Sequence, residues 1–275
     1  MENYICSACG VQYDQSENHP KICIICSDER QYIPESGQQW TTLADLQKSG
    51  CKNRISEVES NLYTIKTFPE VGIGQNAYLI TTTYGNVLWD CITLLDEETK
   101  QAIWDVGGLQ AIVLSHPHYY STIAEWAEAF DCPIYIHESD SEWATRSSSR
   151  YVFWQGEAIS INPEITAINL GGHFAGSSVL HWSKGSEGRG SLLVGDTIYI
   201  VADNRWVTFM YSYPNRIPLP SFEVQRMRDS LENYHFAGMY DAFNKNIKNN
   251  AKEAVINSAD RYIFHVSRKE PLGKK

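Results

Sequence analysis

The chain has 275 residues, of which 43% are hydrophobic and 20% charged, and its formal net charge is −10. This composition is typical of a globular protein with a sizeable core. The acidic balance argues against nucleic acid as a partner, because phosphate backbones are bound by basic surfaces. No window approaches the roughly 18 apolar residues of a membrane span, and the first residues lack the basic start and apolar segment of a secretory signal. We therefore expect a cytoplasmic protein without a membrane partner.

Two Cys-x-x-Cys pairs indicate that residues 1–35 form a small metal-binding module. The first pair is Cys6 and Cys9, and the second is Cys23 and Cys26. Each pair lets a tight turn aim two sulfurs at one ion, so that the two pairs complete a tetrahedral site. The spacing resembles that of zinc ribbons and rubredoxin-like knuckles, which implies structural zinc, with iron as a minor alternative. Without a metal, the cysteines would form two free or redox-active pairs. We favour the metal site, because so short a module needs a metal for its stability.

The rest of the chain divides into a connector and one large domain. Residues 36–60 are polar and mixed, and we expect them to form a connector with a short helix over 41–48. The large domain is expected over 61–275. Apolar periodicity predicts its strands at 62–67, 76–81, 87–91, 110–114, 134–137, 179–182, 192–194 and 207–210. It predicts its helices at 95–104, 122–130, 139–146, 221–234 and 245–258. By itself this pattern indicates an α/β or α+β fold.

The candidate metal ligands of the large domain each follow a predicted strand. His116 and His118 follow the apolar run 110–114 and precede a predicted helix. In an extended backbone residues i and i+2 point the same way, so both imidazoles can reach one ion. His173 follows Gly172 after another apolar run, and Asp196 ends a later one. Three imidazoles and a carboxylate at strand ends predict a metal site.

This series resembles the metallo-β-lactamase superfamily, in which His-x-His-x-Asp-His is followed by a His after Gly and an Asp after Gly. The resemblance implies an αββα sandwich with metal between the two sheets. It also implies that His116, His118, His173 and Asp196 hold one ion. Here Tyr120 and Ser121 replace two ligands of the second ion that binuclear members bind.

The last ligand of that second ion is also missing. The corresponding place falls near residues 241–243, which contain no histidine, and His235 lies too early along the strand. We therefore expect one core ion, with zinc preferred and iron or manganese as alternatives.

These residues predict a metal-dependent hydrolase that uses metal-bound hydroxide on a small ester, lactone, thioester or phosphodiester. Asp196 is expected to orient the water or act as base, Tyr120 to donate a hydrogen bond to a developing oxyanion, and Arg216 to contact an anionic group. One alternative is a non-catalytic protein that binds a protein partner through the N-terminal module. A further alternative is a mononuclear non-haem iron dioxygenase, because two histidines and a carboxylate can form its facial triad.

Overall fold

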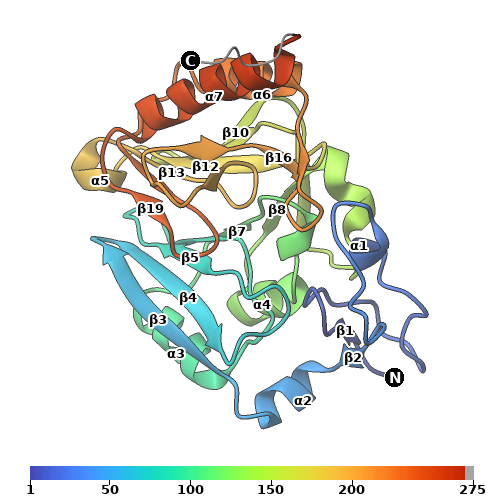
Figure 1. Ribbon diagram of the computed structural model, residues 1–275. Helices are drawn as coiled ribbons and strands as arrows, with labels where there is room; N and C mark the ends of the chain where they lie inside the picture. The colour runs from blue at the N-terminus through green and yellow to red at the C-terminus, as the bar shows by residue number, and fades with distance from the viewer. Residues whose placement is uncertain (270–275) are drawn as a thin grey trace.

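The computed structural model describes residues 1–269 and shows four layers, with two sheets face to face and helices outside both (Figure 1). The first sheet has the order β3-β4-β5-β6-β7-β8-β9, antiparallel from β3 to β6 and parallel from β6 to β9. Its strands are β3 (Lys52–Glu59), β4 (Leu62–Phe68), β5 (Ala77–Ile80), β6 (Val87–Trp89), β7 (Ala111–Val113), β8 (Ile134–His137) and β9 (Tyr151–Trp154). Helices α3 (Glu97–Asp105) and α4 (Ile123–Phe130) cover its outer face (Figure 1).

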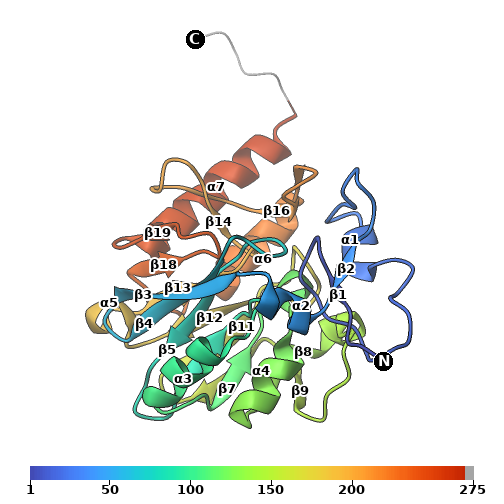
Figure 2. The same cartoon turned by 90° about the horizontal axis from the view of Figure 1, so that it is seen from below.

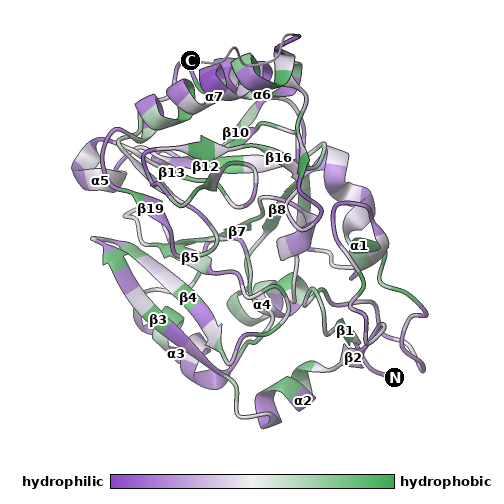
Figure 3. Cartoon of the chain, in the orientation of Figure 1, coloured by the Kyte–Doolittle hydropathy of each residue, from purple (hydrophilic) through white to green (hydrophobic). Residues whose placement is uncertain are grey.

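The second sheet has the order β10-β11-β12-β13-β18-β19. Its strands are β10 (Ala158–Asn162), β11 (Ile165–Asn169), β12 (Ser178–Trp182), β13 (Ser191–Leu193), β18 (Gly238–Tyr240) and β19 (Asn246–Ile247). Only the β13–β18 pair within it is parallel. Helices α6 (Ser221–Ser230) and α7 (Ala251–Ser267) cover its outer face, and their exposed sides are largely hydrophilic (Figure 3).

Three apolar layers hold the sandwich together. Successive residues of a strand face opposite ways, so Leu88 of β6 packs beneath α3 and α4 while the next residue, Trp89, packs between the sheets. Leu193 of β13 contributes to the same inter-sheet layer. The third layer joins the second sheet to α6 and α7 through residues such as Val224 and Val255. The expected αββα sandwich is confirmed.

The remaining elements are short and lie outside the two large sheets. The N-terminal segment contains β1 (Ile5–Cys6), α1 (Ile24–Ser27), β2 (Trp40–Thr41) and α2 (Leu43–Lys48). Two small hairpins follow β13, formed by β14 (Tyr199–Ile200) with β15 (Val207–Thr208) and by β16 (Met210–Ser212) with β17 (Ile217–Pro218). Short turns η1 (Pro117–Tyr119) and η2 (Glu138–Trp143) and the irregular α5 (Gly185–Gly188) complete the set. Within residues 1–269, no helix is both long and apolar enough to cross a membrane.

Three segments differ from the sequence-based expectation. The helix expected over 139–146 is the 3₁₀ turn η2, which ends at Trp143. Residues 52–59, expected in the connector, form the edge strand β3, which pairs with β4 along its whole length. Its alternating charged and polar residues hide the strand from a search for apolar periodicity and suit an exposed sheet edge. The last helix begins at Ala251 rather than near 245 and continues to Ser267, because Asn246 and Ile247 pair with β18 instead. The boundaries of the module at 35 and of the large domain at 61 stay predictions.

Candidate metal centre

The candidate centre lies where strands of both sheets end at one edge of the sandwich. His116 follows β7, whose direction is that of its neighbour β6. In the second sheet β11 and β13 both pair antiparallel with β12, so they share a direction and end at one edge. His173 follows β11, and Asp196 follows β13. A 2.9 Å hydrogen bond from Ser178 N to Ser115 O joins the two edges, so side chains from both sheets meet there.

The loop after β7 is a tight turn rather than the extended backbone expected for His116 to His118. His116 itself is extended (φ −170°, ψ 169°), but Pro117 then begins the 3₁₀ turn η1. The turn still brings the two imidazoles together, with ring centroids 5.0 Å apart. Because residues i and i+3 are aligned in a 3₁₀ turn, Tyr119 lies against His116, with ring centroids 4.4 Å apart.

Four donor atoms, one each from His116, His118, His173 and Asp196, lie within 4.8 Å of one another. His173 Nε2 is 3.2 Å from His118 Nδ1. Two nitrogens bound to one tetrahedral zinc at the usual bond length would be about 3.3 Å apart. Among the residues that the structure describes, buried His116 Nε2 has no hydrogen-bond partner, and it lies 3.7 Å from Asp196 Oδ2. An orphaned nitrogen among converging donors fits a divalent ion.

Neighbouring groups orient three of these four side chains, namely His116, His173 and Asp196. His116 Nδ1 is 2.8 Å from Ser115 Oγ, which turns Nε2 toward the centre. His173 Nδ1 is 2.8 Å from the carbonyl oxygen of Tyr211. A carbonyl oxygen only accepts, so Nδ1 carries the proton and Nε2 keeps its lone pair for a metal. The hydroxyl of Tyr119 donates a 2.6 Å hydrogen bond to Asp196 Oδ1, which leaves Oδ2 free to face His116.

Burial sets the protonation states in the absence of a cation. It lowers the pKa of His173 to about 4 and holds the pKa values of His116 and His118 well below their usual range. These imidazoles are therefore neutral at neutral pH, the form that binds a metal. Burial also raises the pKa of Asp196 to about 7, against the lowering effect of the Tyr119 hydrogen bond. Burial likewise raises the pKa of Tyr119 well above its usual value, so this hydroxyl remains a donor.

Tyr120, expected to donate to an oxyanion, points elsewhere. Its hydroxyl donates a 3.3 Å hydrogen bond to the carbonyl oxygen of Asp140, and its ring packs in the apolar layer of α4. The 3₁₀ turn explains why Tyr120 points away from the site, because it aligns the third residue after His116, rather than the fourth, with that histidine. Tyr119 is thus the site tyrosine that sequence reasoning missed. The proline after His116, which favours a tight turn, was the signal that could have found it.

The positions that correspond to a second ion have other partners. The hydroxyl of Ser121 donates to the carbonyl oxygen of Cys91 at 3.2 Å. Asp241 follows β18, and its Oδ1 accepts hydrogen bonds from two backbone N–H groups of the next turn while Oδ2 has no partner. His235 is exposed and precedes β18, at the end opposite to Asp241. Within residues 1–269, two groups of three or more side chains could hold a metal ion. One is the cluster of three histidines and Asp196, and the other is the four cysteines.

A cavity of about 540 Å³ opens onto the cluster, which makes it accessible to a small molecule. His118, His173 and Asp196 line its floor. Arg216, at the turn between β16 and β17, also lines it and is exposed, as an anion contact requires. Tyr213 lines it as well, and its hydroxyl is buried without a hydrogen-bond partner. Sequence reasoning singled out Arg216, three residues later, but not this hydroxyl.

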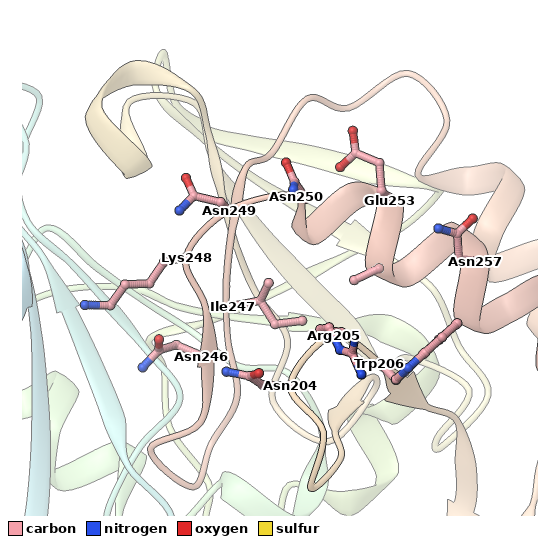
Figure 4. A pocket seen from close by; sticks show the side chains of 11 residues that line it. Asn204, Arg205, Trp206, Asn246, Ile247, Lys248, Asn249, Asn250, Glu253 and Asn257 are labelled. Atoms are coloured by element: carbon pink, nitrogen blue, oxygen red, sulfur yellow. The ribbon is translucent and has the colours of Figure 1, made fainter.

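A larger cavity of about 720 Å³ lies beside the first turn of α7 (Figure 4). Its lining is dominated by asparagine amides and includes the side chain of Trp206. It contains none of the clustered ligands, so we do not regard it as the chemical site.

The four cysteines form a second compact cluster in the N-terminal segment. Cys6 Sγ is 3.6 Å from Cys26 Sγ, and Cys9 Sγ is 3.7 Å from Cys23 Sγ. Sulfurs bound to one tetrahedral zinc would be about 3.8 Å apart. Gln38 Nε2 donates to Cys6 Sγ at 3.0 Å, as expected beside a metal-bound thiolate. All four cysteines are buried and can hold one ion, and they pack in the same apolar layer as α4.

Comparisons with known proteins agree with this architecture. A family model described as the metallo-beta-lactamase superfamily matches residues 71–234. The uncharacterized protein YmaE of Bacillus subtilis (strain 168) is 54% identical over 264 residues, which span 96% of each chain. DIM-1 metallo-beta-lactamase superposes with a TM-score of 0.58 at 15% identity, over 77% of this chain and 98% of its own. The mono-zinc form of FIM-1 from Pseudomonas aeruginosa gives 0.57 at 10% identity, over 77% and 96%. At such low identity these two structures show a common fold alone.

Proposed function

The chain belongs to the metallo-β-lactamase superfamily, and from this premise we propose that it is a metal-dependent hydrolase with one ion in the core site. The observation that carries the proposal is the convergence of His116, His118, His173 and Asp196 at the floor of an open cavity. The side chains at positions 120 and 121 are hydrogen-bonded elsewhere, which supports one ion rather than two. The mono-zinc form of FIM-1 indicates that this fold is compatible with a single ion.

The bound ion, with zinc as the first choice, would polarise the substrate carbonyl or phosphoryl group and lower the pKa of a water toward about 7. The protein contributes orientation and charge. Asp196 Oδ2 lies on the side of His116 and is held there by the Tyr119 bond to Oδ1, so it can orient the attacking water. Tyr213 supplies the donor for the developing oxyanion that we expected from Tyr120. Burial raises the pKa of Tyr213 well above its usual value, which keeps its proton in place.

The cavity indicates the kind of substrate. Ile73, Met210 and Phe243 give it apolar walls, and within the described chain Arg216 is the one cationic side chain that lines it. This lining suits an ester, lactone or thioester with an apolar body and a single acidic group at Arg216. A phosphodiester is also a candidate substrate, although a single cation compensates its negative charge less fully than several cations would.

Hydrolysis by metal-loaded protein is the test. Wild-type protein loaded with zinc, manganese or iron is assayed against esters, lactones, thioesters and phosphodiesters. We expect turnover with zinc or manganese that His118→Ala abolishes, whereas His235→Ala, a change at an exposed histidine outside the cluster, keeps wild-type rates. Equal rates in the two variants would refute the proposal. Iron-dependent oxygen uptake would favour the dioxygenase, and silence in both assays would favour the binding protein.

A further inference from the structure

The cavity over the core site continues toward the four-cysteine module. A second cavity of about 830 Å³ shares four lining residues with the first, namely Gln31, Ile73, Pro214 and Phe243. Its other end is lined by Cys26 of the cysteine cluster and by Tyr32, just after it. The two cavities therefore adjoin each other, and the pair, here called the cleft, extends from the core cluster to the module. Figure 2 shows α1 of the module beside the hairpin that contains β16.

The module wall of this cleft is fixed to the hairpin by hydrogen bonds. Asn215 Nδ2 donates to the carbonyl oxygens of Glu29 and Gln31, at 2.8 and 3.2 Å. Ser212 Oγ donates to the carbonyl oxygen of Arg30 at 3.0 Å. Residues 29–31 follow Cys26 closely, so a metal held by the cysteines determines where this segment starts. These hydrogen bonds place the segment against the hairpin.

Arg30 links the same segment to the core ligands. Its guanidinium lies 3.8 Å from the ring centroid of Phe174, and its Nε is 2.6 Å from a carboxylate oxygen of Asp28. Its Nη1 donates a 3.4 Å hydrogen bond to the carbonyl oxygen of His173. The module therefore contacts a metal-ligand loop directly as well as the hairpin. The family match begins at residue 71, so the module residues that line the second cavity, such as Gln31 and Tyr32, lie outside the match, whereas Ile73 and Pro214 lie within it.

The chemistry of the lining indicates what the cleft accepts. Within the described chain, no charged side chain lines the second cavity. The Tyr32 side chain is 59% exposed, so a ligand can cover its ring and remove apolar surface from water. We propose that the module forms the distal half of the substrate cleft and that the substrate is an elongated ester or thioester whose uncharged arm lies across Gln31 and Tyr32. This inference rests on the proposed hydrolase function.

The test compares substrates of increasing length. Zinc-loaded full-length protein is assayed with p-nitrophenyl acetate and p-nitrophenyl decanoate, and the ratio of the two kcat/KM values is measured. Tyr32→Ala should lower the ratio of kcat/KM for the decanoate ester to kcat/KM for the acetate ester roughly tenfold, mainly by raising KM for the decanoate ester. The loss of apolar contact to one or two methylene groups has an effect of this size. Tyr84→Ala removes another half-exposed tyrosine, in the turn between β5 and β6, and should leave the ratio unchanged.

A second measurement tests ligand binding in the cleft without hydrolysis. Calorimetry gives the affinity of zinc-loaded protein for decanoate, and Tyr32→Ala should weaken it while Tyr84→Ala should not. Hydrolysis whose length dependence is the same in both variants would overturn the cleft and leave the hydrolase intact. Absence of hydrolysis, with decanoate binding that depends on Tyr32, would overturn the hydrolase and support the cleft. Decanoate binding equal in both variants would overturn the cleft in either case.

Discussion

Replacing Tyr119 with Phe removes one hydroxyl from the centre and leaves the ring in place. The lost bond is the 2.6 Å hydrogen bond to Asp196 Oδ1, and the Tyr119 side chain is fully buried, so water cannot replace the donor. A buried hydrogen bond to a charged acceptor contributes about 1.5–3 kcal/mol. Loss of such an orienting partner lowers metal affinity or activity roughly 10- to 100-fold. We expect Tyr119→Phe to weaken core zinc binding and turnover within this range.

The neighbouring tyrosine provides a matched control. Tyr120→Phe removes a hydroxyl of the same kind, but its 3.3 Å bond goes to the carbonyl oxygen of Asp140. It should reduce folding stability by about 0.5–1.5 kcal/mol and leave zinc affinity unchanged. Competition with a chelator measures zinc affinity, and thermal unfolding measures stability. If Tyr119→Phe bound zinc as tightly as Tyr120→Phe, the hydroxyl would not orient Asp196. If Tyr120→Phe alone lost activity, the original assignment of Tyr120 would stand.

Three further outcomes test the two metal sites. Cys26→Ser should release one metal equivalent and lower the melting temperature, because this buried thiol belongs both to the cysteine cluster and to the apolar layer of α4; unchanged metal content on elemental analysis would refute the four-thiolate site. Gly172→Ala should weaken core metal binding, because at φ +83° its added Cβ would lie 2.8 Å from a leucine methyl, whereas Gly156→Ala, at φ +87°, meets nothing within 4 Å and should keep the metal. His173→Ala should lose the core ion, while Asp196→Asn should keep part of it and lose activity; a structure of the wild type with two core ions would contradict the one-ion proposal.

Local patterns were enough to identify the candidate ligands and the fold class. His116, His173 and Asp196 each follow an apolar run, and side chains at strand ends are a local property of the sequence. The cysteine pairs are equally local, because each Cys-x-x-Cys turn is complete within four residues. The two-sheet sandwich followed from the order of strand and helix patterns together with the resemblance that these ligands carry.

Tertiary structure decided what depends on neighbours distant in the chain. The 3₁₀ turn places Tyr119, rather than Tyr120, at the site. The hydroxyl of Tyr119 donates to Asp196, 77 residues away, and no local sequence pattern indicates this contact. Strand β3 exists because β4 supplies its hydrogen bonds, not because its own polar residues favour burial. Arg30 contacts the carbonyl oxygen of His173, 143 residues away, which places the N-terminal segment against the loop of the core cluster. Periodicity specifies which way a side chain points along its own element, whereas packing between elements specifies what it touches.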